Sequence, residues 1–130
     1  MTLNQIAAII ATVIFAIMVV FQLLLASGAP IGHLAWGGKY KRLPYKLRFV
    51  SLVSVVIFIL ACFCVMERAG LSKFIGQNLF IKISVWILAG LFGLSTLGNL
   101  MSQSTIEKRL MTPVALTLTI TCVIVAFGIQ

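Results

Sequence analysis

The sequence predicts an all-α integral membrane protein in which four helices form a bundle across a lipid bilayer. Of its 130 residues, 62% are hydrophobic and only 9% are charged, whereas a soluble domain has about 45–50% apolar and about 25% charged residues. The apolar residues gather in four long stretches that short basic segments separate. A chain of this length forms one domain, so we assign residues 1–130 to a single transmembrane domain.

The first predicted helix covers residues 6–26. Only Thr12 and Gln22 interrupt this apolar run, and about 20 apolar residues suffice to cross the roughly 30 Å of hydrocarbon in a bilayer. A secretory signal peptide is the alternative, since Leu25-Ala26-Ser27 resembles a cleavage site. However, a basic segment is absent before the run, and the run exceeds the 7–15 residues or so of a signal-peptide core. We therefore expect a membrane helix.

The second and third predicted helices cover residues 49–66 and 83–101. Arg48 and the Glu67-Arg68 pair bracket the second helix, and Lys82 precedes the third. These segments lack the alternating pattern of a lipid-facing barrel strand. Because each segment must satisfy its own backbone hydrogen bonds in lipid, helices are the expected form.

The fourth predicted helix covers residues 112–129. Thr112-Pro113 is typical of a helix start. A threonine side chain can cap a helix, and proline lacks the backbone N–H that would be left free in the first turn.

The distribution of Lys and Arg predicts the orientation of the chain. Loops 27–48 and 102–111 lie on one side of the membrane and together hold seven basic residues, whereas the second loop region holds three, Arg68, Lys73 and Lys82. Basic residues accumulate in cytoplasmic loops. We therefore expect a multi-pass protein of the plasma (inner) membrane with loops 27–48 and 102–111 in the cytoplasm and both termini outside.

The first loop combines glycine, proline, aromatic and basic residues. One interpretation is an interfacial loop that anchors the bundle, because aromatic and basic residues favour the headgroup zone. The other is a loop that binds an anion, such as a lipid phosphate, an undecaprenyl-type phosphate or a nucleotide tail, through glycine N–H groups and cationic side chains. It has neither the G-K-[ST] ending of a Walker A loop nor the preceding strand of a dinucleotide site. The candidate ligand-binding residues here are Gly28, His33, Trp36, Gly37, Gly38, Lys39, Lys41 and Arg42.

Polar residues concentrate at the end of the third helix. Ser95, Asn99 and Ser102 follow helical spacing and lead to Glu107. They predict either hydrogen bonds between helices or a polar pocket beside the first loop, with Gln22 close by. Candidate site residues of this group are Gln22, Asn99, Ser102, Gln103, Glu107 and Arg109.

The role of Glu107 stays open from the sequence. Ser104-Thr105-Ile106-Glu107 fits the capping-box pattern, in which the glutamate reaches back to a free N–H. An ion pair with Arg109 or with a lysine of the first loop is the alternative.

Two sequence runs resemble patterns in small four-span bacterial membrane proteins, a group without an assigned function. The first run is Gly28-Ala29-Pro30-x-Gly32 with Ala35-Trp36-Gly37-Gly38-Lys39 and Leu43-Pro44-x-Lys46-Leu47-Arg48. The second is Asn99-x-x-Ser102-x-Ser104-x-x-Glu107-Lys108-Arg109, followed by Thr112-Pro113. The resemblance implies four spans and draws attention to the two loops predicted to be cytoplasmic, but implies no activity.

The chemistry-bearing residues favour binding over catalysis. The chain has two acids and one histidine, His33, and its three cysteines lie in apolar segments. It shows no catalytic set, metal-ligand cluster or cofactor motif. We therefore expect a non-enzymatic accessory or binding protein for a lipid, a lipid-linked ligand or a membrane partner at the basic cytoplasmic face. A small oligomeric transporter or channel is the alternative.

The net charge of +8 predicts anionic lipid headgroups as partners, because the basic residues flank hydrophobic segments. The same position beside the spans argues against nucleic acid. A second copy of the chain or another membrane protein is a further candidate partner.

Overall fold

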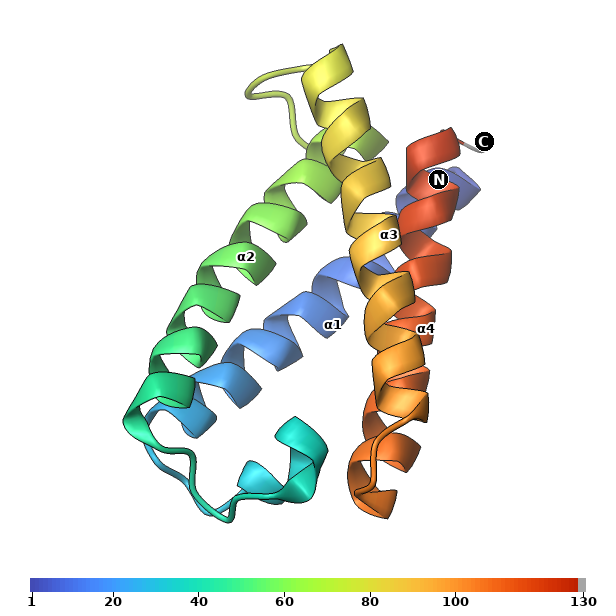
Figure 1. Cartoon of the computed structure of the whole chain (residues 1–130). Coiled ribbons are helices and arrows are strands. Elements are labelled where there is room, and N and C mark those ends of the chain that lie inside the picture. Colours follow the sequence, from blue (N-terminus) through green and yellow to red (C-terminus); the bar gives the residue numbers. More distant parts are fainter. Residues whose placement is uncertain (129–130) are drawn as a thin grey trace.

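The computed structural model describes residues 1–128 and contains four long helices (Figure 1). They are α1 (Leu3–Ala26), α2 (Tyr45–Ala69), α3 (Leu79–Leu100) and α4 (Thr105–Phe127). Two short 3-10 turns, η1 (Gly32–Leu34) and η2 (Trp36–Gly38), lie in the first loop. All four long helices are long and apolar enough to cross a membrane. The prediction of an all-α, multi-pass membrane protein is confirmed.

Helix α1 begins before its apolar run because a capping box fixes its start. The Thr2 hydroxyl accepts a hydrogen bond from the backbone N–H of Gln5 at 3.2 Å, and the Gln5 side chain accepts one from the backbone N–H of Thr2 at 3.4 Å. These two bonds satisfy N–H groups that have no partner inside the helix.

Helix α4 begins at Thr105, so the predicted start at Thr112-Pro113 is wrong. The Ser104 hydroxyl caps the helix by accepting a hydrogen bond from the backbone N–H of Glu107 at 3.3 Å. Pro113 lies inside the helix, which membrane helices tolerate because neighbouring groups can satisfy the carbonyl that proline frees. The predicted end of this helix, Ile129, lies outside the described residues.

The helices form two hairpins, α1 with α2 and α3 with α4, and the hairpins meet mainly through α1 and α4. In Figure 1 both hairpins converge at the end that carries the termini and the 70–78 loop. We call this the termini end. They diverge at the opposite end, where η1 and η2 lie between the first hairpin and α4; we call this the first-loop end.

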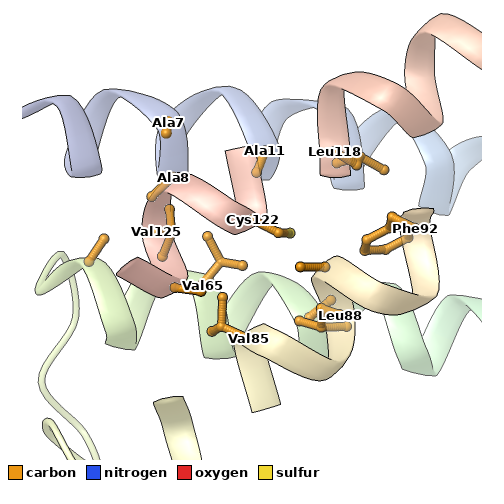
Figure 2. Packing of buried hydrophobic residues seen from close by; sticks show 14 of the residues in the cluster. Ala7, Ala8, Ala11, Val65, Val85, Leu88, Phe92, Leu118, Cys122 and Val125 are labelled. Carbon is orange, nitrogen blue, oxygen red and sulfur yellow. The ribbon is translucent and has the colours of Figure 1, made fainter. Parts of the chain in front are cut away.

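Small residues bring all four helices together in the half near the termini end (Figure 2). Ala8 of α1, Val65 of α2, Val85 of α3, and Cys122 and Val125 of α4 are each 0% exposed. In lipid, where hydrophobic burial contributes little to helix association, small side chains stabilise a bundle by allowing close van der Waals packing.

Three phenylalanines meet at mid-bundle. The ring centroids of Phe15 and Phe92 lie 5.6 Å apart, those of Phe15 and Phe58 lie 6.0 Å apart, and those of Phe58 and Phe92 lie 6.2 Å apart. We call these residues the phenylalanine cluster. It joins α1, α2 and α3 and marks the limit of the close-packed half.

A buried glutamate organises the loop between α2 and α3. The Glu67 carboxylate accepts hydrogen bonds from the backbone N–H groups of Phe74 at 2.6 Å, Ile75 at 3.3 Å and Gly76 at 2.8 Å, and from the Ser72 hydroxyl at 2.8 Å. The residue is 0% exposed. The carboxylate therefore accepts the hydrogen bonds that these loop donors at the termini end would otherwise make with water.

Candidate functional site

A cavity of about 470 Å³ occupies the half of the bundle near the first-loop end. All four helices and the first loop contribute to its walls. The apolar lining includes Met18, Phe21, Leu25, Leu34, Val50, Ile57, Phe58, Leu91, Phe92, Met111, Val114 and Leu118. The polar lining consists of Gln22, Ser51, Ser54, Ser95, Asn99 and Glu107. The cavity is therefore an apolar chamber with polar groups from every helix.

The first loop forms the end wall of this cavity. Its residues Leu34, Ala35 and Trp36 line the chamber. The loop is held in shape by a backbone hydrogen bond from Gly32 to the carbonyl of Lys41 at 2.9 Å. A Cβ on Gly32 would lie 2.6 Å from the carbonyl oxygen of Tyr40, so this close crossing requires glycine.

The same loop is docked on the first turn of α4. The Ser104 hydroxyl donates a hydrogen bond to the carbonyl of His33 at 3.1 Å, and the backbone N–H of Gly37 donates one to Glu107 Oε2 at 3.4 Å. A Cβ on Gly38 would lie 2.7 Å from the Cβ of Ser104. Trp36, one of the three loop residues that line the cavity, adopts a φ of 54°, a value that few residues other than glycine adopt. The docked loop thus holds Trp36 in an uncommon conformation.

Four of the candidate residues come together at this cavity: Gln22, Trp36, Asn99 and Glu107. They reach it from α1, the first loop, α3 and α4, as the expectation of a joint site between the first loop and the end of the third helix requires. Among these side chains, Asn99 donates to the carbonyl of Met111 at 3.5 Å.

Other candidates lie beside the cavity without lining it. His33, Gly37 and Gly38 dock the loop on α4, and the Ser102 hydroxyl accepts a hydrogen bond from the backbone N–H of Ser104 at 3.1 Å. Gly28 lies far from this contact, and a Cβ there would lie 2.8 Å from the Arg48 guanidinium.

The basic side chains of the first loop remain outside the cavity. Lys39, Lys41 and Arg42 are exposed, and the Lys39 ammonium lies 5.6 Å from the ring centroid of Tyr40. Within residues 1–128, no Lys, Arg or His lines the chamber. Gln103 and Arg109 are likewise exposed and do not line it. The charge inside the cavity is therefore negative.

That charge belongs to Glu107, which is only 6% exposed. It lies in the first turn of α4, at the helix end that carries a partial positive charge. The backbone N–H of Ser104 is bonded to Ser102, so Glu107 does not complete a capping box. Across the described part of the chain, Glu107 forms no ion pair with Arg109 or with a lysine.

Sequence reasoning missed the contribution of α2. Ser51 is 2% exposed and lines the cavity together with Ser54. The Ser54 hydroxyl donates to the carbonyl of Val50 at 3.0 Å, whereas the Ser51 hydroxyl makes no hydrogen bond with the described residues. The signal was present in the sequence, because two serines three positions apart share one face of a helix.

The arrangement offers binding groups and little for catalysis. One carboxylate, amides and hydroxyls face the chamber, and residues 1–128 contain no group of three or more His, Cys, Asp or Glu side chains that could hold a metal ion. The chain matches no protein-family model, no curated protein sequence and no solved structure.

Proposed function

We propose that this membrane protein is a non-enzymatic binding protein that holds an amphipathic membrane molecule, a lipid or a lipid-like compound, in its internal cavity. The observation that carries this proposal is the half-open cavity of about 470 Å³ that both hairpins and the first loop line. Its volume falls within the range of roughly 300–1,000 Å³ typical of small-ligand sites, and such sites have mostly apolar walls with a few polar groups.

The distribution of the lining residues supports an amphipathic ligand. Gln22, Asn99 and Glu107 lie near the helix ends that face the first loop, whereas Phe58 and Phe92 line the cavity toward mid-bundle. A ligand with its polar head near the first loop and its apolar tail toward the bilayer centre would match the polar and the apolar end of the cavity. This is also the orientation of a lipid in one leaflet.

The exposed basic residues of the first loop support a separate contact with the membrane surface. Lys39, Lys41 and Arg42 lie on the outside of the loop, where each basic residue near an anionic leaflet contributes about 1 kcal/mol of attraction. We infer that anionic headgroups are bound on this outer surface and that the occupant of the cavity is recognised by other groups.

A small oligomeric transporter or channel is the alternative function. Any path from the cavity to the termini end has to pass the phenylalanine cluster and the core beyond it, where Ala8, Val65 and Val125 are 0% exposed. A chamber that is closed on one side in this way favours a binding protein over a pore.

Filling the cavity tests the proposed function. Ala115 lines the chamber and is 5% exposed, whereas its neighbour Leu116 is 46% exposed and does not line it. We expect the unmodified protein, purified in mild detergent, to retain a lipid-like molecule in native mass spectrometry. Ala115→Phe should lose most of that molecule, because the new ring occupies the chamber, and Leu116→Phe should retain it. Equal retention by both variants, or no bound molecule in the unmodified protein, contradicts the proposal.

The orientation of the chain is part of the same proposal. Loops 27–48 and 102–111 carry more basic residues than the 70–78 loop region, so we infer that the first-loop end faces the cytoplasm. A tag added at the C-terminus should then react with an impermeant reagent in intact cells. A tag inserted after Lys41 should react only after permeabilisation. A C-terminal tag that is protected in intact cells contradicts this orientation.

A further inference from the structure

We propose that the cavity selects a ligand with a positively charged head, an ammonium group attached to an apolar tail, and that Glu107 is the residue that recognises the charge. This inference rests on the proposed binding function and names the chemistry of the ligand. It differs from the expectation of an anionic ligand, which followed from the basic first loop.

The charge inside the cavity is negative. Glu107 lines the cavity and is 6% exposed, and no basic side chain of residues 1–128 lines the cavity with it. A buried carboxylate without a cation is unfavourable in an apolar environment. A cationic ligand head would remove that cost, whereas a phosphate would increase it.

The protein fills only part of the capacity of the Glu107 carboxylate to accept hydrogen bonds. Glu107 Oε2 accepts one long hydrogen bond, 3.4 Å from the backbone nitrogen of Gly37, and Oε1 accepts none from the described residues. The contrast with Glu67 is informative, because that carboxylate accepts bonds from three backbone N–H groups and one hydroxyl. Glu67 is therefore saturated by its own loop, while Glu107 retains capacity for a ligand.

Neutral polar groups line the same cavity as the Glu107 carboxylate. The buried Ser51 hydroxyl and the Gln22 amide line the same cavity and make no side-chain hydrogen bond with residues 1–128. Trp36 also lines the cavity while 49% exposed, and aromatic rings attract ammonium groups. A carboxylate, an aromatic ring and neutral hydrogen-bonding groups together fit an amine or a quaternary ammonium head.

The test uses the whole 130-residue chain in nanodiscs of digalactosyldiacylglycerol, a neutral lipid without an ammonium group. Trp86→Phe is the background, so that the measured tryptophan fluorescence comes from Trp36 alone. The probes share one tail: dodecyltrimethylammonium, dodecanol and laurate. A Trp36→Phe variant retains Trp86 on α3 near the termini end. The fluorescence of Trp86 in this variant measures how each probe partitions into the bilayer. We expect saturable binding of the ammonium probe and weaker binding of the alcohol and the acid.

Two variants separate charge recognition from loop docking. Glu107→Gln keeps an oxygen that can accept from Gly37 but removes the charge, and it should weaken ammonium binding roughly tenfold or more while leaving dodecanol binding unchanged. Ser104→Ala removes the bonds to Glu107 N–H and to the His33 carbonyl but keeps the carboxylate, and it should retain the preference for the ammonium probe.

The outcomes distinguish this inference from the proposed function. Equal binding of all three probes, or unchanged ammonium binding in Glu107→Gln, overturns the inference and leaves the binding function intact. No saturable binding of any probe overturns both. If the ligand is a lipid with an amine head, phosphatidylethanolamine in the nanodisc should compete with the ammonium probe; if it is a free amphiphile, the affinity for the probe should not depend on that lipid.

Discussion

Replacing Glu67 with Ala is expected to disorder the 70–78 loop and to lower the melting temperature more than any other single polar substitution outside the cavity. The carboxylate is 0% exposed and accepts four hydrogen bonds from loop donors. Its loss leaves three backbone N–H groups at the termini end without an acceptor. Hydrogen bonds to a charged acceptor stabilise a fold more than neutral ones do, so the loss of four of them is destabilising. Thermal unfolding in detergent measures the change.

The controls for this prediction come from the same loop. Lys73 is exposed and makes no hydrogen bond with the described residues, so Lys73→Ala should leave the melting temperature unchanged. The melting temperature of Glu67→Gln should lie between those of Glu67→Ala and Lys73→Ala. The glutamine amide keeps one accepting oxygen but brings an NH₂ group toward the N–H donors of the loop. Limited proteolysis should cut the 70–78 loop faster in Glu67→Ala than in Lys73→Ala. A melting temperature of Glu67→Ala equal to that of Lys73→Ala is incompatible with a capping role.

Glu67 also shows where prediction from the sequence stops. Read locally, it is an acid in the last turn of a helix, where the partial negative charge of the helix end disfavours it. Its role depends on the loop folding back so that Phe74 and Gly76 point their N–H groups at the carboxylate. A contact of this kind follows from the path of the loop, and residue type alone does not reveal it.

The four spans were predictable because the bilayer imposes length and apolarity on each of them. The start of α4 was predicted too late, although Ser104-Thr105-Ile106-Glu107 fits the pattern of a helix start. Ser104 caps a polar turn that precedes the apolar segment, and Pro113 then lies within the helix. Hydropathy identifies the part of a helix that lipid can surround. The cap and the first turn are determined by hydrogen bonds outside that part.

The sequence predicted part of the polar lining of the candidate site but not the position of the basic residues. Gln22, Trp36, Asn99 and Glu107 were all candidates from the sequence, and the structure places them at the same cavity. The basic side chains of the loop were expected beside them, yet they lie in the open. Long cationic side chains keep their charged ends hydrated while the loop backbone packs inward, so the residues most visible in the sequence are not those that face the chamber.

The second large effect is expected for Phe15→Ala, which removes the α1 ring from the phenylalanine cluster. Phe15 is 1% exposed. In a soluble core, Phe→Ala destabilises by about 3–5 kcal/mol through the lost transfer energy and the new void. In lipid, burial contributes little, so we expect mainly the packing loss, about 1–3 kcal/mol, measured by unfolding in detergent. Phe49→Ala is the matched control, because Phe49 is 67% exposed and its removal leaves no void.

The same substitution probes how the cavity is closed. A smaller, half-open groove of about 300 Å³ lies between α1 and α2, and Phe15 and Phe58 line it. Phe58 lines the main cavity as well, so removal of the Phe15 ring should connect the two spaces. A binding protein should then accept longer apolar tails, with dodecyl and hexadecyl compounds binding more nearly alike than in the unmodified protein. No leak of ions or amphiphiles is expected when Phe15→Ala is reconstituted in liposomes, because the core beyond the cluster, where Ala8, Val65 and Val125 are 0% exposed, stays closed. A leak would favour the transporter. Because both readouts come from one variant with one control, they separate the two functions without depending on the charge of the ligand.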